Sequence, residues 1–233
     1  MDVSSDMPAD APGKTSQFEE WFARASEIGP NKKQSIRRRN EQKILSAAEV
    51  QFAKEGFRGT TIGDIAKCAD LPRANIMYYF ESKEDIYRTV LYRMCLAWEG
   101  PANEFSIYSN PKEAMTTYIR AKMQLAREQP NGSKVWVSEV LRGAEIVDDY
   151  LREHLRGWLE SRSNVVRHWI KLGLIEPVDP RTLFFSIWAT TQHYADFSDQ
   201  LCILNDDEPF SDDQFEIITT NITQLYLRGM GIS

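Results

Sequence analysis

An indole and a primary amide stand one helical turn apart near the C-terminal end of the chain. In the run LFFSIWATTQHYADF, residues 183–197, Trp188 and Gln192 are spaced i and i+4, so on a helix they share one face. A flat indole beside an amide that both donates and accepts hydrogen bonds suits a planar heterocycle with alternating N–H and C=O groups. The same spacing fits a packed tryptophan beside a glutamine bonded to a neighbouring helix carbonyl. The two residues alone leave both interpretations open.

The polar block around this pair interrupts an otherwise apolar run. It consists of Thr190, Thr191, Gln192 and His193. Because an unpartnered buried amide or imidazole costs about 1–3 kcal/mol, another part of the protein or a ligand must satisfy these groups. If a ligand is that partner, we expect Thr191 and Gln192 to border a small pocket together with Trp188. His193 points about 100° away from Gln192 on a helix, which favours a structural role.

A second informative stretch, TTIGDIAKCADLPRANIMYYFESKEDIY, begins with Thr60 and Thr61. Thr61 and Asp64 match a capping box that starts a short helix over residues 62–69. Pro72 then suits the first turn of another short helix over residues 73–79. Two short helices joined by a tight turn, inside a basic three-helix unit, predict a helix-turn-helix.

The second of these helices carries side chains that suit base recognition. Arg73, Ala74 and Asn75 stand at its front, where a recognition helix reaches base edges in the major groove. Arginine pairs well with guanine and asparagine with adenine, and alanine admits a thymine methyl group. The other residues expected to contact DNA, mainly through hydroxyl, ammonium or backbone N–H groups on phosphates, are Thr60, Thr61, Tyr78, Tyr79 and Lys83.

Helical spacing of apolar residues dominates the rest of the sequence, and strand-like alternation is nearly absent. Breakers divide the pattern, among them QPNG at 129–132, EPVDP at 176–180 and NDDEPFSDD at 205–213. The sequence therefore predicts an all-α protein of about nine helices without a sheet.

The charge of the chain is distributed unevenly. The 233 residues carry a formal net charge of −6, but residues 31–93 carry +5 and residues 94–233 carry −7. A small basic module followed by a larger acidic one favours a nucleic-acid-binding unit joined to a unit with another role. A solvated basic face would explain the asymmetry equally well.

Several classes of protein lack support in the sequence. No run of about 18 apolar residues predicts a membrane span, and the acidic N-terminus lacks the centre of a secretory signal. Cys68, Cys95 and Cys202 have no paired spacing, so reduced thiols and a cytoplasmic protein are expected. No metal-ligand spacing, nucleophile or phosphate loop is present, and we expect no metal, no cofactor and no catalytic residue.

Residues 1–30 predict a partly disordered extension. Within it, FEEWFARA at 18–25 places its apolar residues on one face of a short amphipathic helix. The basic run NKKQSIRRRN at 31–40 fits either a solvated helix start or a set of phosphate contacts.

The run ILSAAEVQFAKEGFRGTTIGDIAKCADLPRANIMYYFESKEDIY, residues 44–87, resembles the DNA-binding domain of TetR-family transcription regulators. The resemblance rests on the GF..TT junction, the IA..A helix and the YYF.SKE link, although Pro72 stands where members often have a serine cap. It implies an all-helical homodimer on a palindromic double-stranded DNA operator, with three DNA-binding and about six ligand-binding helices per subunit. We therefore expect a DNA-binding domain over residues 31–84 and a ligand-binding and dimerisation domain over residues 85–233. The apolar helices near 180–200 and 212–229 are expected to form the dimer.

The acidic module is similar to a uracil- and thymine-responsive repressor of the same family. The likeness includes IWATTQHYADF at 187–197 and YIRAKM at 118–123. It implies that Trp98, Trp188 and Gln192 border an effector pocket, and Trp136 is a further pocket candidate. The implied function is a repressor that a small planar effector, uracil or thymine, releases from DNA. A TetR-family regulator of another pathway, sensing a different small metabolite, is the alternative.

Overall fold

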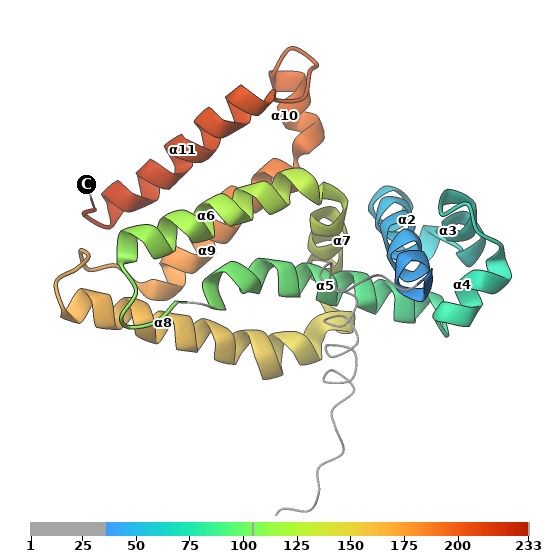
Figure 1. The fold of residues 1–233 in the computed structure, drawn as a ribbon, viewed down its shortest axis with the longest axis horizontal. Coiled ribbons are helices and arrows are strands. Elements are labelled where there is room, and N and C mark those ends of the chain that lie inside the picture. The colour runs from blue at the N-terminus through green and yellow to red at the C-terminus, as the bar shows by residue number, and fades with distance from the viewer. Residues whose placement is uncertain (1–35, 104, 233) are drawn as a thin grey trace, which may run out of the picture.

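The computed structural model describes residues 36–103 and 105–232 (Figure 1). These residues form ten α-helices and no strand, so the predicted all-α fold is confirmed. The helices are α2 (Ile36–Gly59), α3 (Ile62–Cys68), α4 (Arg73–Tyr79), α5 (Lys83–Asn103), α6 (Pro111–Glu128), α7 (Pro130–Leu141), α8 (Arg156–Lys171), α9 (Pro180–Asp196), α10 (Ser198–Leu204) and α11 (Asp212–Gly229). The extension predicted over residues 1–30 lies outside the described residues.

Helices α2, α3 and α4 gather at one end of the molecule and form its head, at the right of Figure 1. The predicted capping box is present, because the Thr61 hydroxyl accepts the Asp64 N–H and the Asp64 carboxylate accepts the Thr61 N–H. Asp70, in the left-handed region at φ 50°, turns the chain between α3 and α4. The head's core consists mainly of Ile44, Leu45, Ala48, Phe52, Ile65, Ile76 and Phe80.

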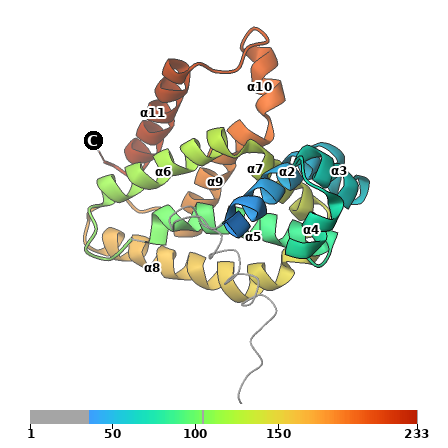
Figure 2. The same cartoon turned by 45° about the vertical axis from the view of Figure 1, so that its right-hand side comes forward.

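Helix α5 runs from the head into the body of the molecule, as Figures 1 and 2 show. Its first half packs Ile86 and Val90 into the core of the head. Its second half carries Trp98 and Glu99 into the body. Because one helix belongs to both parts, a tilt of α5 would displace the head relative to the body.

The body is built around α6 and α9, which pack against each other. Helices α5, α7 and α11 also contact α6, and α7, α8 and α10 contact α9. The apolar stripe of α6 supplies Met115, Ile119 and Met123 to a core shared with Phe184 and Ile187 of α9. This core fixes the helices that surround the cavity described below.

Two parts of the body differ from the sequence prediction. The helix expected over 180–200 ends at Asp196, since Phe197 (φ −113°, ψ 27°) leaves helical geometry before α10 begins. From α5 onward the described residues therefore form seven α-helices rather than about six. Between α7 and α8, Ala144 is left-handed at φ 59°, and a 3-10 turn (Glu145–Val147) and a π-helical turn (Tyr150–Leu155) follow.

The helices expected to dimerise, α9 and α11, keep part of their apolar residues inside the subunit. Four of those apolar residues are buried in the subunit's own core: Leu183, Phe184, Ile187 and Ile222. On the same two helices Phe185, Ile217 and Leu225 are exposed. Any dimer face on α9 and α11 would use this second set, and dimerisation itself stays a prediction.

Candidate ligand cavity and nucleic-acid interface

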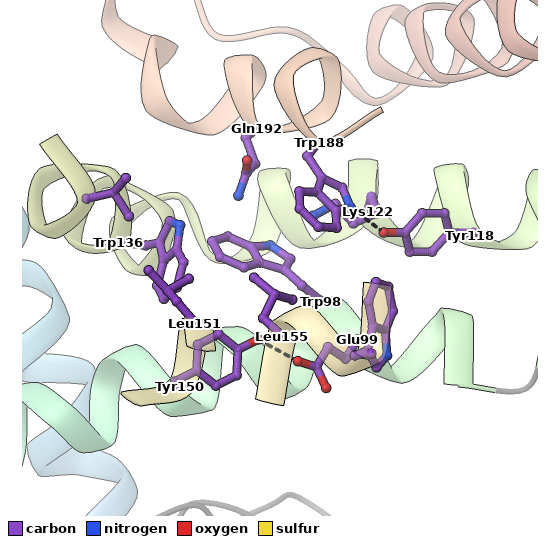
Figure 3. Close-up of a pocket in the computed structure, with 12 residues that line it drawn as sticks. Trp98, Glu99, Tyr118, Lys122, Trp136, Tyr150, Leu151, Leu155, Trp188 and Gln192 are labelled. Carbon is purple, nitrogen blue, oxygen red and sulfur yellow. Dashed lines mark hydrogen bonds between the residues drawn. The ribbon is translucent and has the colours of Figure 1, made fainter. Parts of the chain in front are cut away.

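A cavity of about 210 Å³ lies in the body, between α5, α6, α7, α9 and the segment that leads into α8 (Figure 3). It is mostly aromatic and aliphatic, and a few polar groups enter it. The lining residues are Trp98, Glu99, Tyr118, Lys122, Trp136, Val140, Tyr150, Leu151, Leu155, Trp158, Trp188 and Gln192. Because pockets for drug-sized ligands occupy roughly 300–1,000 Å³, this smaller volume favours a ligand of a single ring.

The tryptophans of this cavity are held in fixed orientations. Trp188 Nε1 donates a hydrogen bond to the Tyr118 hydroxyl at 2.7 Å. Trp98 and Trp136 meet edge to face, with ring centroids 5.6 Å apart. Side chains that are already ordered lose little conformational freedom when a ligand packs on them, so these rings form a preorganised wall.

Most of the polar block on α9 is satisfied within the protein. The Thr190 hydroxyl pairs with the Tyr226 hydroxyl at 2.7 Å. Thr191 is fully buried, and its hydroxyl donates to the Ile187 carbonyl of its own helix at 2.8 Å. The His193 ring stacks on the ring of Phe197, just past the end of α9, and is partly exposed, so water can reach its nitrogens. These three side chains therefore need no ligand.

Gln192 is the exception in this block. Its side chain points into the cavity (Figure 3), and no described residue forms a hydrogen bond with its amide. Thr191, predicted beside it at the pocket, is not one of the lining residues. That expectation is corrected, because helical geometry turns Thr191 into the core while Gln192 faces the cavity.

The acidic residue of the cavity lining, Glu99, is paired with other side chains of the protein. The buried Glu99 carboxylate accepts a hydrogen bond from the Tyr150 hydroxyl at 2.5 Å and lies 2.8 Å from His154 Nε2. Burial, assisted by the nearby Cys95 and Glu99, raises the pKa of the Tyr150 phenol, which keeps it protonated as a donor. The Glu99 carboxylate thus already has hydrogen-bond partners within the protein.

Among the described residues that line the cavity, Lys122 is the only one with a cationic side chain. It reaches the cavity from α6, is 2% exposed, and places Nζ 4.7 Å from the centroid of the Trp98 ring, over its face. Burial lowers the pKa of this ammonium to about 7, although Asp196 acts in the opposite direction.

Four of the five predicted pocket residues lie around this one cavity: Trp98, Trp136, Trp188 and Gln192. The lining residues from α6 and from residues 150–158 were not anticipated. One signal was available for Lys122, because it stands one turn after Tyr118 in the buried stripe of α6, where an apolar residue is expected.

The head presents the front of α4 to solvent. Arg73 and Ala74 are exposed, Asn75 is partly exposed and Tyr78 is 75% exposed, whereas Ile76 is buried in the core of the head. An exposed polar front on the second helix of a helix-turn-helix fits the recognition role predicted for these side chains.

The two threonines before α3 have other partners. Thr60 is 1% exposed; its hydroxyl donates to the carbonyls of Gln51 and Gly56, and its N–H donates to Gly56. Thr60 has no donor left for a phosphate, so this prediction is wrong. Thr61 is exposed, but its hydroxyl and N–H both donate to Asp64 in the capping box.

Lys83 and Tyr79 also have partners within the head. Lys83 Nζ donates to the carbonyls of Phe57 at 2.6 Å and Thr60 at 2.8 Å, so it caps the end of α2. One N–H of the ammonium is left for a phosphate. The Tyr79 hydroxyl accepts a hydrogen bond from Asn40 Nδ2 at 3.0 Å. Both side chains thus position the head, and their contact with DNA stays a prediction.

The described residues contain neither a metal site nor a membrane span. No group of three or more His, Cys, Asp or Glu residues there could hold a metal ion. None of the helices in that part of the chain is long and apolar enough to cross a membrane.

Comparison with protein families agrees with this geometry. Residues 44–90 match the model of bacterial regulatory proteins of the tetR family, and residues 91–233 match the C-terminal region of YcdC-like protein. The second match alone spans more than half of the chain. The chain belongs to the TetR family.

Two curated relatives of this TetR-family regulator are helix-turn-helix transcriptional regulators. RutR of Escherichia coli strain K12 is 39% identical over 158 residues, which are 68% of this chain and 74% of RutR. YhgD of Bacillus subtilis strain 168 is 24% identical over 143 residues, 61% of this chain and 75% of YhgD. The TetR-family chain is thus a DNA-binding transcriptional regulator and not an enzyme.

Solved structures share the fold of this TetR-family regulator. The ketosteroid transcriptional regulator KstR2 of Mycobacterium tuberculosis superposes with a TM-score of 0.63 and 18% identity, covering 82% of this chain and 94% of KstR2. The probable transcriptional regulatory protein RHA5900 gives a TM-score of 0.63, also at 18% identity, and the superposition covers 82% of this chain and 98% of RHA5900. At this identity the likeness concerns the fold alone.

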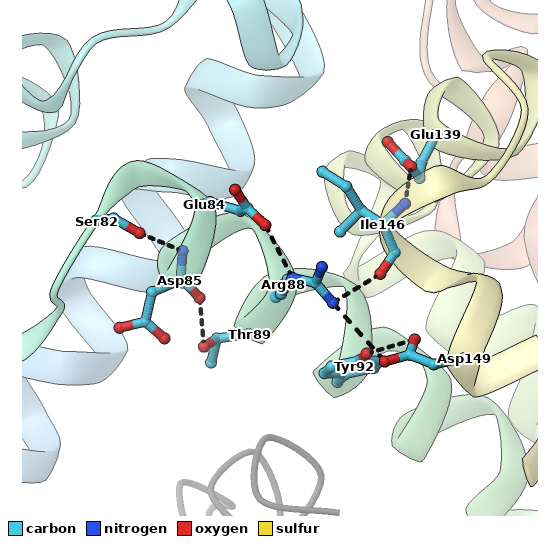
Figure 4. A network of polar contacts seen from close by, with 9 residues as sticks. All are labelled: Ser82, Glu84, Asp85, Arg88, Thr89, Tyr92, Glu139, Ile146 and Asp149. Atoms are coloured by element: carbon cyan, nitrogen blue, oxygen red, sulfur yellow. Dashed lines mark hydrogen bonds and ion pairs between the residues drawn. The ribbon is translucent and has the colours of Figure 1, made fainter. Parts of the chain in front are cut away.

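Polar contacts in the TetR-family regulator tie the cavity wall to the first half of α5 (Figure 4). Arg88 Nη1 donates to the Ile146 carbonyl at 3.0 Å and lies 3.8 Å from the Asp149 carboxylate. The Tyr92 hydroxyl donates to the same carboxylate at 3.1 Å. Asp149 directly precedes Tyr150, which lines the cavity, so these contacts join this wall to the half of α5 that enters the head.

A second contact supports the same segment from α7. The buried Glu139 carboxylate accepts the Tyr87 hydroxyl at 3.2 Å and the Ile146 N–H at 2.9 Å. Glu139 is adjacent to Val140 of the cavity lining. Both sets of contacts, those of Asp149 and those of Glu139, reach α5 within its first three turns, next to the head.

Proposed function

We propose that this regulator is a repressor that a small planar heterocycle of the pyrimidine-base class, uracil or thymine, releases from its operator. The ring would lie against Trp98 and Trp188, and the Gln192 amide would pair with an adjacent N–H and C=O of the ring. The sequence resemblance to a uracil- and thymine-responsive repressor supports the same ligand class.

The observation that supports this ligand class most directly is the unpartnered Gln192 amide at the wall of a small aromatic cavity. An amide both donates and accepts, so it is matched best by a ligand edge that does the same. The flat indoles favour an aromatic ring, and the volume of about 210 Å³ favours one ring over a larger skeleton.

On DNA we propose a homodimer whose two heads read successive major-groove faces about 34–36 Å apart. Arg73, Ala74, Asn75 and Tyr78 would make the main contacts. The effector acts only if it binds the DNA-incompetent arrangement more tightly than the competent one. The contacts of Arg88 and Tyr92 with Asp149 offer the physical route, since they join the cavity wall to α5.

A TetR-family regulator of another pathway is the second candidate. The Gln192 amide and Lys122 ammonium would also serve a different small ring that carries carbonyl groups. This alternative keeps the mechanism and changes only the ligand.

The test combines a selected operator with direct ligand binding. Random-sequence selection should enrich an inverted repeat, and uracil or thymine should give heat in calorimetry and release that operator. Reduced pyrimidines, which lack the flat ring, should bind more weakly. Absence of heat with both bases, together with operator release by an unrelated metabolite, would overturn the pyrimidine assignment.

A further inference from the structure

The buried ammonium of Lys122 has no counter-charge in direct contact. No carboxylate oxygen of the described residues comes within 4.0 Å of Nζ, and no described residue accepts a hydrogen bond from it. Nζ lies over the face of Trp98, 4.7 Å from the ring centroid. A charged group in so apolar a setting is costly unless an acceptor reaches it.

The acidic groups nearby are engaged elsewhere. Glu99 is bound by Tyr150 and His154. The carboxylate of Asp196, on α9, accepts the Ser133 hydroxyl at 2.6 Å. The described residues thus provide no hydrogen-bond acceptor for Lys122 Nζ, and an occupant of the cavity is placed to supply one.

We infer that Lys122 is a specificity-determining residue of the cavity, whose Nζ donates a hydrogen bond to a carbonyl oxygen of the bound ring. This inference rests on the proposed function, and it adds a requirement that Gln192 alone does not impose. The ring must carry an exocyclic oxygen at the position that meets Lys122. A ring of the same size without that oxygen leaves the ammonium unpaired and is rejected.

The ammonium and the amide divide recognition between them. Gln192 approaches from α9 and Lys122 from α6, and Figure 3 shows both side chains reaching toward Trp98. Gln192 both donates and accepts, whereas a protonated lysine only donates. The pair therefore selects a ring edge with alternating N–H and C=O groups together with a further acceptor.

Binding of such a ring should be coupled to protonation of Lys122. Burial holds the pKa of the free ammonium near 7, and a ligand oxygen on Nζ would raise it again. The titratable groups that act on Lys122 are Asp196 from α9 and Cys95 from α5, with Glu99 and Tyr150 also at the cavity. Burial raises the pKa of the Cys95 thiol, which therefore stays neutral at this pH.

The experiment compares uracil with the two pyrimidinones that each lack one of its two exocyclic carbonyl oxygens, by calorimetry on the full chain. In the wild type, removal of the oxygen that meets Lys122 should weaken binding about tenfold or more. In Lys122→Met, uracil should bind more weakly than in the wild type. The difference in affinity between uracil and the pyrimidinone that lacks this oxygen should fall to about twofold or less. At pH 7.5, uracil binding by the wild type should take up protons, as measured in buffers of different ionisation enthalpy, and Lys122→Met should take up none.

Lys112→Met, an exposed lysine at the start of the same helix, is the matched control and should bind like the wild type. Thermal unfolding of Lys122→Met checks that the variant is folded. If uracil binds but the ranking of the pyrimidinones and the proton uptake are the same in Lys122→Met, the inference is wrong and the proposed function stands. If no pyrimidine binds the wild type, both fail.

Discussion

The indole N–H of Trp188 and the hydroxyl oxygen of Tyr118 form a 2.7 Å hydrogen bond that joins α9 to α6 at the wall of the cavity. Tyr118 is fully buried, and burial raises the pKa of its phenol, so the group stays neutral. A lone pair of its oxygen accepts the indole N–H. The bond fixes the plane of the Trp188 ring. The orientation of this wall thus depends on a residue from another helix.

Tyr118→Phe should free the Trp188 ring while preserving the volume of the buried side chain. We expect a loss of about 1 kcal/mol in the free energy of unfolding, from one missing hydrogen bond, and weaker uracil binding. Tyr226→Phe is the control, because it removes the hydroxyl partner of Thr190, which does not line the cavity. Denaturant titration and calorimetry measure both effects; equal ligand affinity in the two variants would contradict the role of Tyr118.

Gln192→Leu should remove the response to effector and leave operator binding intact. The lost amide leaves a ring N–H and C=O unpaired, which should reduce affinity for uracil by about 1–3 kcal/mol. Fluorescence anisotropy of labelled operator, with and without uracil, separates the two properties. Unchanged release of the operator by uracil would show that the amide makes no contact with the ligand.

Arg73→Ala should weaken binding to the selected operator by about 1–3 kcal/mol and relax preference at one base pair of each half-site. Arg73 stands exposed at the front of α4, where a guanidinium can reach a guanine. Arg152→Ala serves as the control, since Arg152 is an exposed arginine of the body paired with Asp148. Equal losses in both variants would mean that only overall charge matters.

Asp149→Asn should weaken the link between the cavity and the head. The amide keeps the size of the carboxylate but loses the charge that Arg88 faces at 3.8 Å. Uracil affinity of the free protein should change by about twofold at most, whereas the uracil concentration for half-release of the operator should rise several-fold. Asp148→Asn, which affects only the exposed pair with Arg152, should leave release unchanged. Identical release curves for both variants would exclude this route.

Lys122→Met should make the free protein more stable, most of all at low pH. The pKa of Lys122 in the folded protein, about 7, lies below the ordinary lysine value of 10.5. Between these two pH values the unfolded chain therefore binds more protons than the folded chain. Wild-type stability should therefore rise with pH above 7, by at most about 1.4 kcal/mol per pH unit from this group. The gain in the free energy of unfolding of Lys122→Met over the wild type is largest below pH 7 and shrinks toward pH 9. Urea titrations at pH 6, 7.5 and 9 measure it, and a constant difference would contradict the lowered pKa.

The helix-turn-helix could be predicted from sequence because its signals are local. A capping box, a proline in a first turn and apolar residues at helical spacing act within a few residues, so the bounds of α4 agree with the prediction. The partners of Thr60 and Lys83 could not be predicted in this way. The Lys83 bonds depend on how the end of α2 meets the start of α5, more than twenty residues away. The Thr60 hydroxyl bonds to Gln51 and Gly56 depend on the non-helical backbone at Gly56 near the end of α2.

The cavity could be predicted only in part, for the same reason. The i, i+4 spacing of Trp188 and Gln192 identified one wall, but Tyr118 and Lys122 enter from another helix. Residues 150–155 adopt a π-helical turn, and their apolar spacing resembles that of an ordinary helix. Thr191 was misplaced because its hydroxyl bonds to its own helix, an arrangement that composition does not reveal.

Four of the six tryptophans of the chain border the cavity, and Trp169 is buried in the core of the body. Their emission depends on whatever touches the indole rings, so the protein carries its own optical reporter of occupancy. A heterocycle stacked on Trp98 and Trp188 would quench these two indoles, while Trp169 would provide a steady background within the same spectrum. Collections of unlabelled metabolites can therefore be screened on the unmodified protein, before its operator is known.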